Sequence, residues 1–250
     1  MSDVSLPSQP EARTAAVIPA AGRGVRLGPG APKALRALNG TPMLIHAVRA
    51  MAASRAVSLV VVVAPPDGTA EVKTLLDAHA LPDRTDFVVV PGGDSRQESV
   101  KYGLDVLPPD VDIVLVHDAA RPLVPVDTVD AVIEAVREGA LAVVPALPLA
   151  DTVKEVEPAA VAGEPEPVVA TPERARLRAV QTPQGFDRRT LLRAHETVTG
   201  DVTDDASMAE RLGVPVVVVP GHEEAFKVTR PLDLVLAEAV LARRRLNDGF

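Results

Sequence analysis

The stretch PAAGRGVRLGPGAPK, residues 19–33, follows a short apolar run at 15–18 that predicts a buried first strand. Its residues are mostly small, which leaves backbone N–H groups open to close approach by a ligand. Arg26 and Lys33 add fixed positive charge to this bare loop. A loop of this kind after a first strand is suited to binding a polyphosphate. The small residues at its start are Ala20, Ala21 and Gly22.

The spacing within this loop excludes two better-known phosphate loops. A P-loop needs a hydroxyl residue directly after its lysine, but Ala34 follows Lys33. The dinucleotide fingerprint needs a third glycine three residues after the second, and Leu27 occupies that position after Gly24. The loop by itself leaves two interpretations open: a phosphate loop of another type, or a flexible surface turn with two solvated cations.

Beyond the loop, apolar strands alternate with amphipathic helices. We expect strands at 15–19, 58–64, 87–90, 112–116 and 141–145, and helices at 42–54, 71–80, 97–107 and 126–138. This alternation predicts an α/β fold: a three-layer sandwich around a mostly parallel, Rossmann-like sheet. Ligands of such sheets bind beyond the carboxyl ends of the strands. The turns that follow three of these strands, at 19–33, 91–96 and 117–122, should therefore meet at one cleft.

Residues 149–180 interrupt this pattern. Two alternating segments, 151–156 and 168–171, flank a tip rich in Pro, Gly and Glu, which indicates a protruding β-arm. An arm that leaves a compact domain usually meets a second copy of the chain, so we expect it to serve dimerisation. The alternative is a floppy insertion.

The remaining segments complete one domain, which we expect to span 15–250 after a disordered tail at 1–14. The pattern predicts an ordered turn at 181–186, helices at 187–198 and 203–212, a buried strand at 215–220, a short edge segment at 225–229 and a closing helix at 231–245. In the closing helix the residues expected to face inward are Leu234, Val235, Ala239 and Val240.

Composition narrows the class of protein. The 250 residues are 47% hydrophobic and 24% charged, which is ordinary for a globular domain. Aromatic residues make up 2% and the net charge is −8, so we expect no nucleic-acid partner. The chain has no cysteine, which excludes disulfides, thiolate metal sites and a cysteine nucleophile. We find neither a signal peptide nor an apolar run of membrane length, and expect a cytoplasmic protein without membrane contact.

The candidate chemical groups favour transfer of a phosphate-bearing group. No serine–histidine–aspartate arrangement is evident. Asp118, at the end of an expected strand, is a Mg²⁺ ligand by type, although it could instead cap a turn or pair with Arg121. His117 is more often a packed, hydrogen-bonded residue at such a position. Phosphoryl and nucleotidyl transfer need alignment and neutralised charge, which Arg26, Lys33 and Lys227 could supply with Mg²⁺.

Seven short motifs follow one another along the chain. They are PAAGxGxR…PK, GGDxxxxS, VHDAARP, DTVK, TPQxF, TDDAS and KVTxPxDL, together within residues 17–234. Each motif is weak by itself, but the ordered set resembles the 2-C-methyl-D-erythritol 4-phosphate cytidylyltransferase family of the non-mevalonate isoprenoid pathway.

The resemblance implies an enzyme that joins CTP and 2-C-methyl-D-erythritol 4-phosphate, with Mg²⁺, and releases pyrophosphate. Arg26 and Lys33 match residues that stabilise the transition state. Arg174 and Lys227 match residues that position the polyol phosphate for attack. The matched CTP-binding positions are Ala20, Ala21, Gly22, Gly93, Asp94 and Ser99. The matched substrate-binding positions are Asp118, Arg121, Thr152, Arg174 and Thr203, with Asp118 also on the metal side.

The family also implies a homodimer whose arm brings Thr152 and Arg174 to the partner subunit's site. One departure is Ala225-Phe226, where the family often has Asn-Ile. Two rival hypotheses remain: a cytidylyltransferase for another polyol phosphate, such as ribitol 5-phosphate, and a nucleotide-binding regulatory domain without catalysis. The intact set of cations at 26, 33 and 227 argues against the second.

Overall fold

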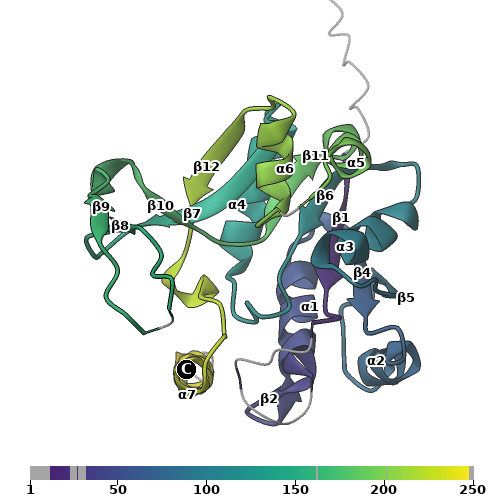
Figure 1. Cartoon of the computed structure of the whole chain (residues 1–250). Helices are drawn as coiled ribbons and strands as arrows, with labels where there is room; N and C mark the ends of the chain where they lie inside the picture. Colours follow the sequence, from purple (N-terminus) through teal and green to yellow (C-terminus); the bar gives the residue numbers. More distant parts are fainter. Residues whose placement is uncertain (1–11, 23–26, 28–31, 162, 201, 248–250) are drawn as a thin grey trace, which may run out of the picture.

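The computed structural model describes residues 12–22, 27, 32–161, 163–200 and 202–247, and Figure 1 shows its arrangement. An eight-stranded sheet has the order β10-β7-β11-β6-β1-β4-β5, with β12 pairing to β7. Its strands are β1 (Arg13–Pro19), β4 (Val57–Ala64), β5 (Asp86–Pro91), β6 (Val111–Val116), β7 (Ala142–Pro148), β10 (Arg178–Val180), β11 (Gln184–Asp187) and β12 (Val216–Pro220).

Helices cover both faces of this sheet, because its central strands are apolar on both sides. The helices are α1 (Met43–Ala53), α2 (Thr69–Asp77), α3 (Arg96–Asp105), α4 (Val126–Arg137), α5 (Arg188–Thr197), α6 (Asp205–Arg211) and α7 (Pro231–Asn247). Along β1, Ala16 and Ile18 pack in one core cluster with α1, α2 and α4. Ala15 and Val17 point the other way and pack with α3, α5 and α6. The predicted three-layer α/β sandwich is confirmed.

The parallel part of the sheet sets where the turns lie. β1 pairs in parallel with β4 and with β6, and β4 pairs in parallel with β5. The carboxyl ends of β1, β5 and β6 therefore share one edge of the sheet. β11 runs antiparallel between β6 and β7, and β12 joins β7 in parallel. The sheet is thus mixed, with a parallel core.

Several sequence-based boundaries need correction. β11 occupies part of the span 181–186 that was expected to be a turn, because its pairing comes from β6 and β7 and not from local alternation. Strand β12 was expected to be buried, yet its side chains are mostly exposed because it lies at the edge next to β7. Arg13 and Thr14, expected in a disordered tail at 1–14, belong to β1; residues 1–11 lie outside the described part.

The expected inward face of α7 was also partly wrong. Leu234 and Val240 contact a small cluster with Leu27, Leu38 and Met43, as predicted. Val235 is 62% exposed and Ala239 is exposed, whereas Ala237 is fully buried in that cluster. The buried face of α7 differs from the predicted one because packing against this cluster decides which side of the helix is buried. The expected edge segment 225–229 is instead the end of a 3-10 turn, η4 (Glu223–Ala225), followed by coil.

The span 149–180 contains a separate two-stranded antiparallel sheet of β8 (Glu155–Val156) and β9 (Val168–Ala170). All five residues of these two strands are exposed, and Figure 1 shows them beyond the β7 and β10 edge of the main sheet. A short 3-10 turn, η3 (Arg174–Arg176), leads into β10. Use of this span as a protruding dimerisation arm stays a prediction. In the part of the chain that the structure describes, every helix is too short or too polar to span a lipid bilayer.

Candidate active site

A cavity of about 330 Å³ lies at the carboxyl ends of the parallel strands. The turns after β1, β5 and β6 all line it, as expected from the positions of the three loops. Lys33, in the 3-10 turn η2 (Lys33–Leu35), and Lys227, from the segment before α7, also line it. The sheet therefore gathers small residues, cations and carboxylates from distant parts of the chain into one cavity.

The bare loop after β1 packs closely on the turn after β5. The Ala20 N–H donates to the Val63 carbonyl at 2.8 Å, and the Gly92 N–H donates to the Ala64 carbonyl at 2.8 Å. A Cβ at Gly92 would lie 2.8 Å from Ala21 Cβ and 3.0 Å from Ser99 Oγ. Only a residue without a side chain permits this approach, so Gly92 is what lets the two loops form one wall of the cavity.

The turn after β5 is fixed by its own hydrogen bonds. Ser95 caps α3 and accepts from the Glu98 N–H at 3.0 Å. Gly93 N–H donates to Ser99 Oγ at 3.1 Å, and Asp94 N–H donates to Glu98 Oε2 at 2.7 Å. Ser99 is buried, whereas Gly93 is partly exposed and Asp94 is exposed, and both line the cavity. These hydrogen bonds hold the turn in one conformation.

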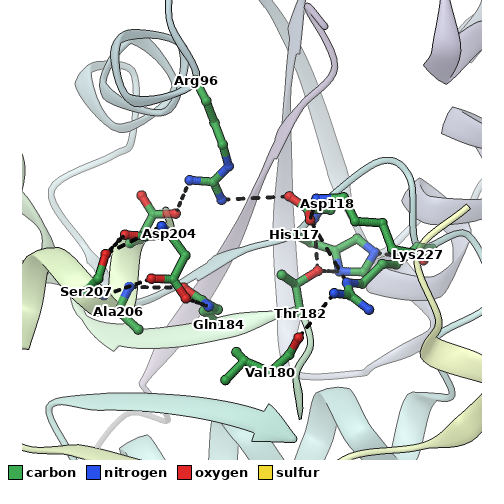
Figure 2. Close-up of polar contacts among 12 residues, drawn as sticks. Arg96, His117, Asp118, Val180, Thr182, Gln184, Asp204, Ala206, Ser207 and Lys227 are labelled. Carbon is green, nitrogen blue, oxygen red and sulfur yellow. Dashed lines mark hydrogen bonds and ion pairs between the residues drawn. The ribbon is translucent and has the colours of Figure 1, made fainter. Parts of the chain in front are cut away.

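Asp118 lies at the end of β6 among the cations Arg96, Arg121 and Lys227. Figure 2 shows it between Arg96 and Lys227. Lys227 Nζ is 2.7 Å from Asp118 Oδ2, and Arg96 Nη2 is 3.7 Å from Oδ1. Arg121 Nε lies 4.0 Å from Oδ2. Burial by itself raises the pKa of Asp118, but the charges of Lys227, Arg96 and Arg121 outweigh it and lower the pKa to about 2. Asp118 is therefore ionised at neutral pH.

His117 is a structural residue, in agreement with the interpretation favoured from the sequence. It is fully buried, with Nε2 3.1 Å from the Arg121 carbonyl and Nδ1 3.0 Å from Thr182 Oγ1. Thr182 Oγ1 also accepts from the Asp118 N–H at 3.0 Å. This pattern fits a neutral imidazole that donates from Nε2. Burial lowers the pKa of His117 to about 4, despite the opposing charge of Asp118, so the ring is neutral at pH 7.

Arg121 holds three segments together. Its guanidinium donates to the Ala225 carbonyl at 2.7 Å and to the Val180 carbonyl at 3.2 Å. The side chain is 12% exposed. It thus connects the turn after β6 with β10 and with the segment that carries Lys227. Its placement explains why Lys227, far away in the sequence, approaches Asp118.

The predicted site residues are only partly brought together. Those that line the cavity are Ala20, Ala21, Gly22, Lys33, Gly93, Asp94, Ser99, Asp118 and Lys227. Among the predicted residues that the structure describes, Arg121, Thr152, Arg174 and Thr203 lie outside this lining; the last three are exposed. Arg26 lies outside the described residues.

Sequence reasoning missed Arg96. It lines the cavity as the first residue of α3 and pairs with Asp118 and with the buried Asp205. Its place in the turn at 91–96, which was expected at the cleft as a whole, was a usable signal. Asp205 carried no such signal, since it was interpreted only as part of a helix cap.

The cavity suits a divalent cation held by one protein carboxylate together with substrate phosphates. Among the described residues, no three histidine or acidic side chains are grouped closely enough to hold a metal by themselves. Asp94 and Asp118 are the carboxylates in the described lining of the cavity. Mg²⁺ commonly takes one or two carboxylates plus phosphate oxygens and water, so Asp118 suits it as a single protein ligand beside a polyphosphate. Lys227 Nζ contacts Oδ2 at 2.7 Å, whereas Arg96 Nη2 is 3.7 Å from Oδ1, so Oδ1 is the oxygen more open to a cation.

Comparisons with known proteins show which family the chain belongs to. The model of the 2-C-methyl-D-erythritol 4-phosphate cytidylyltransferase family matches residues 14–243. The enzyme so named from Streptomyces avermitilis is 90% identical over the full length of both chains. The one from Frankia casuarinae is 55% identical over 92% of this chain and 82% of its own length.

Solved structures of the same family share the fold. The structure of 2-C-methyl-D-erythritol 4-phosphate cytidylyltransferase from Thermus thermophilus is 35% identical, with a TM-score of 0.69 over 90% of this chain and 97% of that chain. The 4-diphosphocytidyl-2C-methyl-D-erythritol synthase from Anaerococcus prevotii is 27% identical, with a TM-score of 0.77 over 92% and 99% of the two chains. With its ordered motifs, its cavity and these relatives, the chain belongs to the 2-C-methyl-D-erythritol 4-phosphate cytidylyltransferase family.

Proposed function

We propose that this chain joins CTP and 2-C-methyl-D-erythritol 4-phosphate to give 4-diphosphocytidyl-2-C-methyl-D-erythritol and pyrophosphate. The observation that carries the proposal is the cavity at the sheet edge, where Lys33 and Lys227 meet the bare loop and Asp118. A relative that carries the name of this activity is 90% identical over the full chain. The chain is accordingly a nucleotidyltransferase of isoprenoid precursor biosynthesis.

The reaction is a displacement between two anions. A phosphate oxygen of the polyol phosphate forms a bond to the α-phosphorus of CTP. The bond from that phosphorus to the bridging oxygen breaks, and the electron pair leaves with pyrophosphate. The nucleophile is already an anion, so no general base is required. The protein has to align the two substrates and offset their mutual repulsion.

The cationic side chains of the cavity reduce the repulsion between the two anionic substrates. Lys33, just after the bare loop, suits the phosphates of CTP, whose oxygens gain charge as pyrophosphate leaves. Lys227 stands beside Asp118 on another wall and suits the attacking phosphate. The backbone of residues 20–22 suits the triphosphate. The turn at Gly93, Asp94 and Ser99 suits the base and ribose. Arg26 is proposed to act with Lys33.

Mg²⁺ is proposed as the cofactor, with Asp118 as its protein ligand. When bound, it would neutralise phosphate charge in the transition state. A homodimer is also proposed, in which Thr152 and Arg174 of the arm reach the polyol phosphate in the partner subunit. The exposure of β8 and β9 and of Arg174 supports this arrangement, because exposed apolar side chains such as Val168 favour a protein contact. Arg121 and Thr203 are proposed to shape the substrate side, and the compartment is proposed to be the cytoplasm without nucleic-acid or membrane partners.

A pyrophosphate-release assay tests the proposed function. The full chain is incubated with CTP and Mg²⁺ and with one polyol phosphate at a time: 2-C-methyl-D-erythritol 4-phosphate, ribitol 5-phosphate, erythritol 4-phosphate or glycerol 3-phosphate. Release with the first and little with the others is expected. Turnover of ribitol 5-phosphate without turnover of the methylerythritol phosphate would overturn the substrate. CTP binding with no release from any of them would overturn catalysis.

A further inference from the structure

Arg96 forms a bridge between the cavity and a buried carboxylate behind it. Its Nη1 lies 2.7 Å from Asp205 Oδ2, and its Nη2 lies 3.7 Å from Asp118 Oδ1. Figure 2 shows the guanidinium pointing between Asp118 and the residues around the start of α6. The two nitrogens of one planar group thus serve two carboxylates, which a lysine ammonium could not do with the same geometry.

Asp205, the buried partner of Arg96, is itself held in place. Asp205 is fully buried and its Oδ1 lies 2.9 Å from Nε2 of the buried His195 on α5. The start of α6 is bound to β11 by Gln184, which accepts from the Ala206 N–H at 3.0 Å and donates to Asp204 Oδ2 at 2.7 Å. Asp205 is thus buried against His195, and its neighbours Asp204 and Ala206 are fixed by Gln184, so the carboxylate that pairs with Arg96 has little freedom to move.

At the other end of the Arg96 guanidinium, its contact with Asp118 fixes the orientation of that carboxylate. Arg96 Nη2 faces Oδ1 at 3.7 Å, whereas Lys227 Nζ contacts Oδ2 at 2.7 Å and Arg121 Nε lies 4.0 Å from that same oxygen. Rotation of the carboxylate would separate both pairs at once. We propose that Arg96, held by Asp205, is a positioning residue that sets the orientation of Asp118 and through it the location of the Lys227 ammonium.

This inference rests on the proposed function and deepens it, because the group being positioned is the one assigned to the attacking phosphate. It differs from direct binding of CTP by Arg96, which the place of Arg96 in the cavity lining would also allow. The two roles predict different kinetics. A positioning role affects the rate of the chemical step, whereas a direct ground-state contact with CTP affects its affinity.

The test uses Asp205→Asn and Arg96→Lys in the full chain. Asp205 lies outside the cavity lining, so its change acts through Arg96. We expect each variant to lower kcat by a factor on the order of 10 to 100, as small misplacements of reacting groups do. The dissociation constant for CTP, measured by calorimetry without polyol phosphate, should change less than about twofold, because positioning leaves ground-state binding intact. Arg96→Lys keeps the charge and a partly exposed side chain, so it tests the idea even where Asp205→Asn folds poorly.

Lys101→Gln is the matched control. Lys101 lies on the same helix as Arg96 and pairs on the surface with Asp105 at 3.1 Å. Its removal takes one positive charge from α3 without touching the bridge, so kcat should stay within about twofold, as for exposed ion pairs.

The double variant Arg96→Lys with Asp205→Asn separates positioning from general destabilisation. If Asp205 acts through Arg96, the double variant should lose no more activity than Arg96→Lys does. If the fold-losses in kcat of the two single variants multiply in the double variant, Asp205 and Arg96 act independently and the proposed coupling is overturned. An unchanged kcat in Asp205→Asn, or a raised CTP dissociation constant with an unchanged kcat in Arg96→Lys, would overturn the positioning role.

A crystal structure of Asp205→Asn gives a readout independent of turnover. We expect the Asp118 carboxylate to rotate and its contact with Lys227 to lengthen; an unaltered pair would contradict the inference. Absence of pyrophosphate release by the unaltered chain would overturn the proposed function and leave this structural result to decide the role of Arg96.

Discussion

Lys227 Nζ lies 2.7 Å from Asp118 Oδ2, although the two residues come from opposite halves of the chain. The Val228 N–H donates to the Ala120 carbonyl at 2.8 Å, which joins the two segments next to this pair. Arg121 adds a second connection through the Ala225 carbonyl. The ion pair is thus set by backbone and buried side-chain contacts, not by its own attraction alone.

The charge of Asp118 should contribute to acid stability. Its pKa is lowered in the folded protein to about 2 from an ordinary 3.8, so its stabilisation is present above pH 3.8 and is lost as the pH falls toward 2. Asp118→Asn should therefore lower the free energy of unfolding at pH 6 and converge with the unaltered protein near pH 2. Urea unfolding at several pH values measures this. Equal differences at pH 6 and pH 2 would contradict it.

His117 should make stability depend on pH in a different window. Its pKa falls from 6.5 to about 4 on folding, so only the unfolded chain binds the proton between these values. Stability should rise with pH across this window, by up to about 3 kcal/mol from this group. His117→Asn should flatten that rise and cost about 1–3 kcal/mol at pH 7 through lost buried hydrogen bonds.

Lys33→Ala should impair the chemical step. The lysine lines the cavity and is proposed to offset the charge that develops on the leaving pyrophosphate. We expect kcat to fall by about 100- to 1000-fold, with a smaller change in the KM for CTP. Steady-state pyrophosphate release measures both constants. An unchanged kcat with a raised KM would assign Lys33 to ground-state binding.

Gly103→Ala should destabilise the fold without altering the site. Gly103 lies on α3 where it crosses β1, and a Cβ there would lie 2.5 Å from Val17 Cγ1 and 3.0 Å from Val63 Cγ2. Overpacking of this kind costs about 1–3 kcal/mol. Thermal and urea unfolding should show the loss, and KM values at low temperature should remain unchanged. A variant as stable as the unaltered chain would mean that α3 can move away from the sheet.

The proposed shared site can be tested by mixing inactive subunits. Arg174→Ala should raise the KM for the polyol phosphate and leave the KM for CTP unchanged, because the arm is assigned to the partner subunit's substrate. Subunits carrying Arg174→Ala and subunits carrying Lys33→Ala should regain activity together after exchange, since one mixed site would be intact. Each variant incubated with itself is the control. No recovery in dimers shown to exchange would contradict a composite site.

The sequence determined the α/β architecture and the cleft, because both depend on local patterns. Apolar runs such as 58–64 predict buried parallel strands, and the turns after them must share one edge of the sheet. The ordered motifs from the bare loop to KVTxPxDL likewise indicate the family from the sequence alone, and the family model that matches residues 14–243 confirms it.

Only the tertiary structure decided which side chains meet. The identity of β11 as a strand depends on partners supplied by β6 and β7, and the exposure of β12 depends on its place at the sheet edge. Arg96 joined the site because folding places it between Asp118 and the buried Asp205. Such pairs involve residues far apart in the chain. Their contact energy depends on distances that local periodicity does not encode, so no reading of spacing alone could assign them.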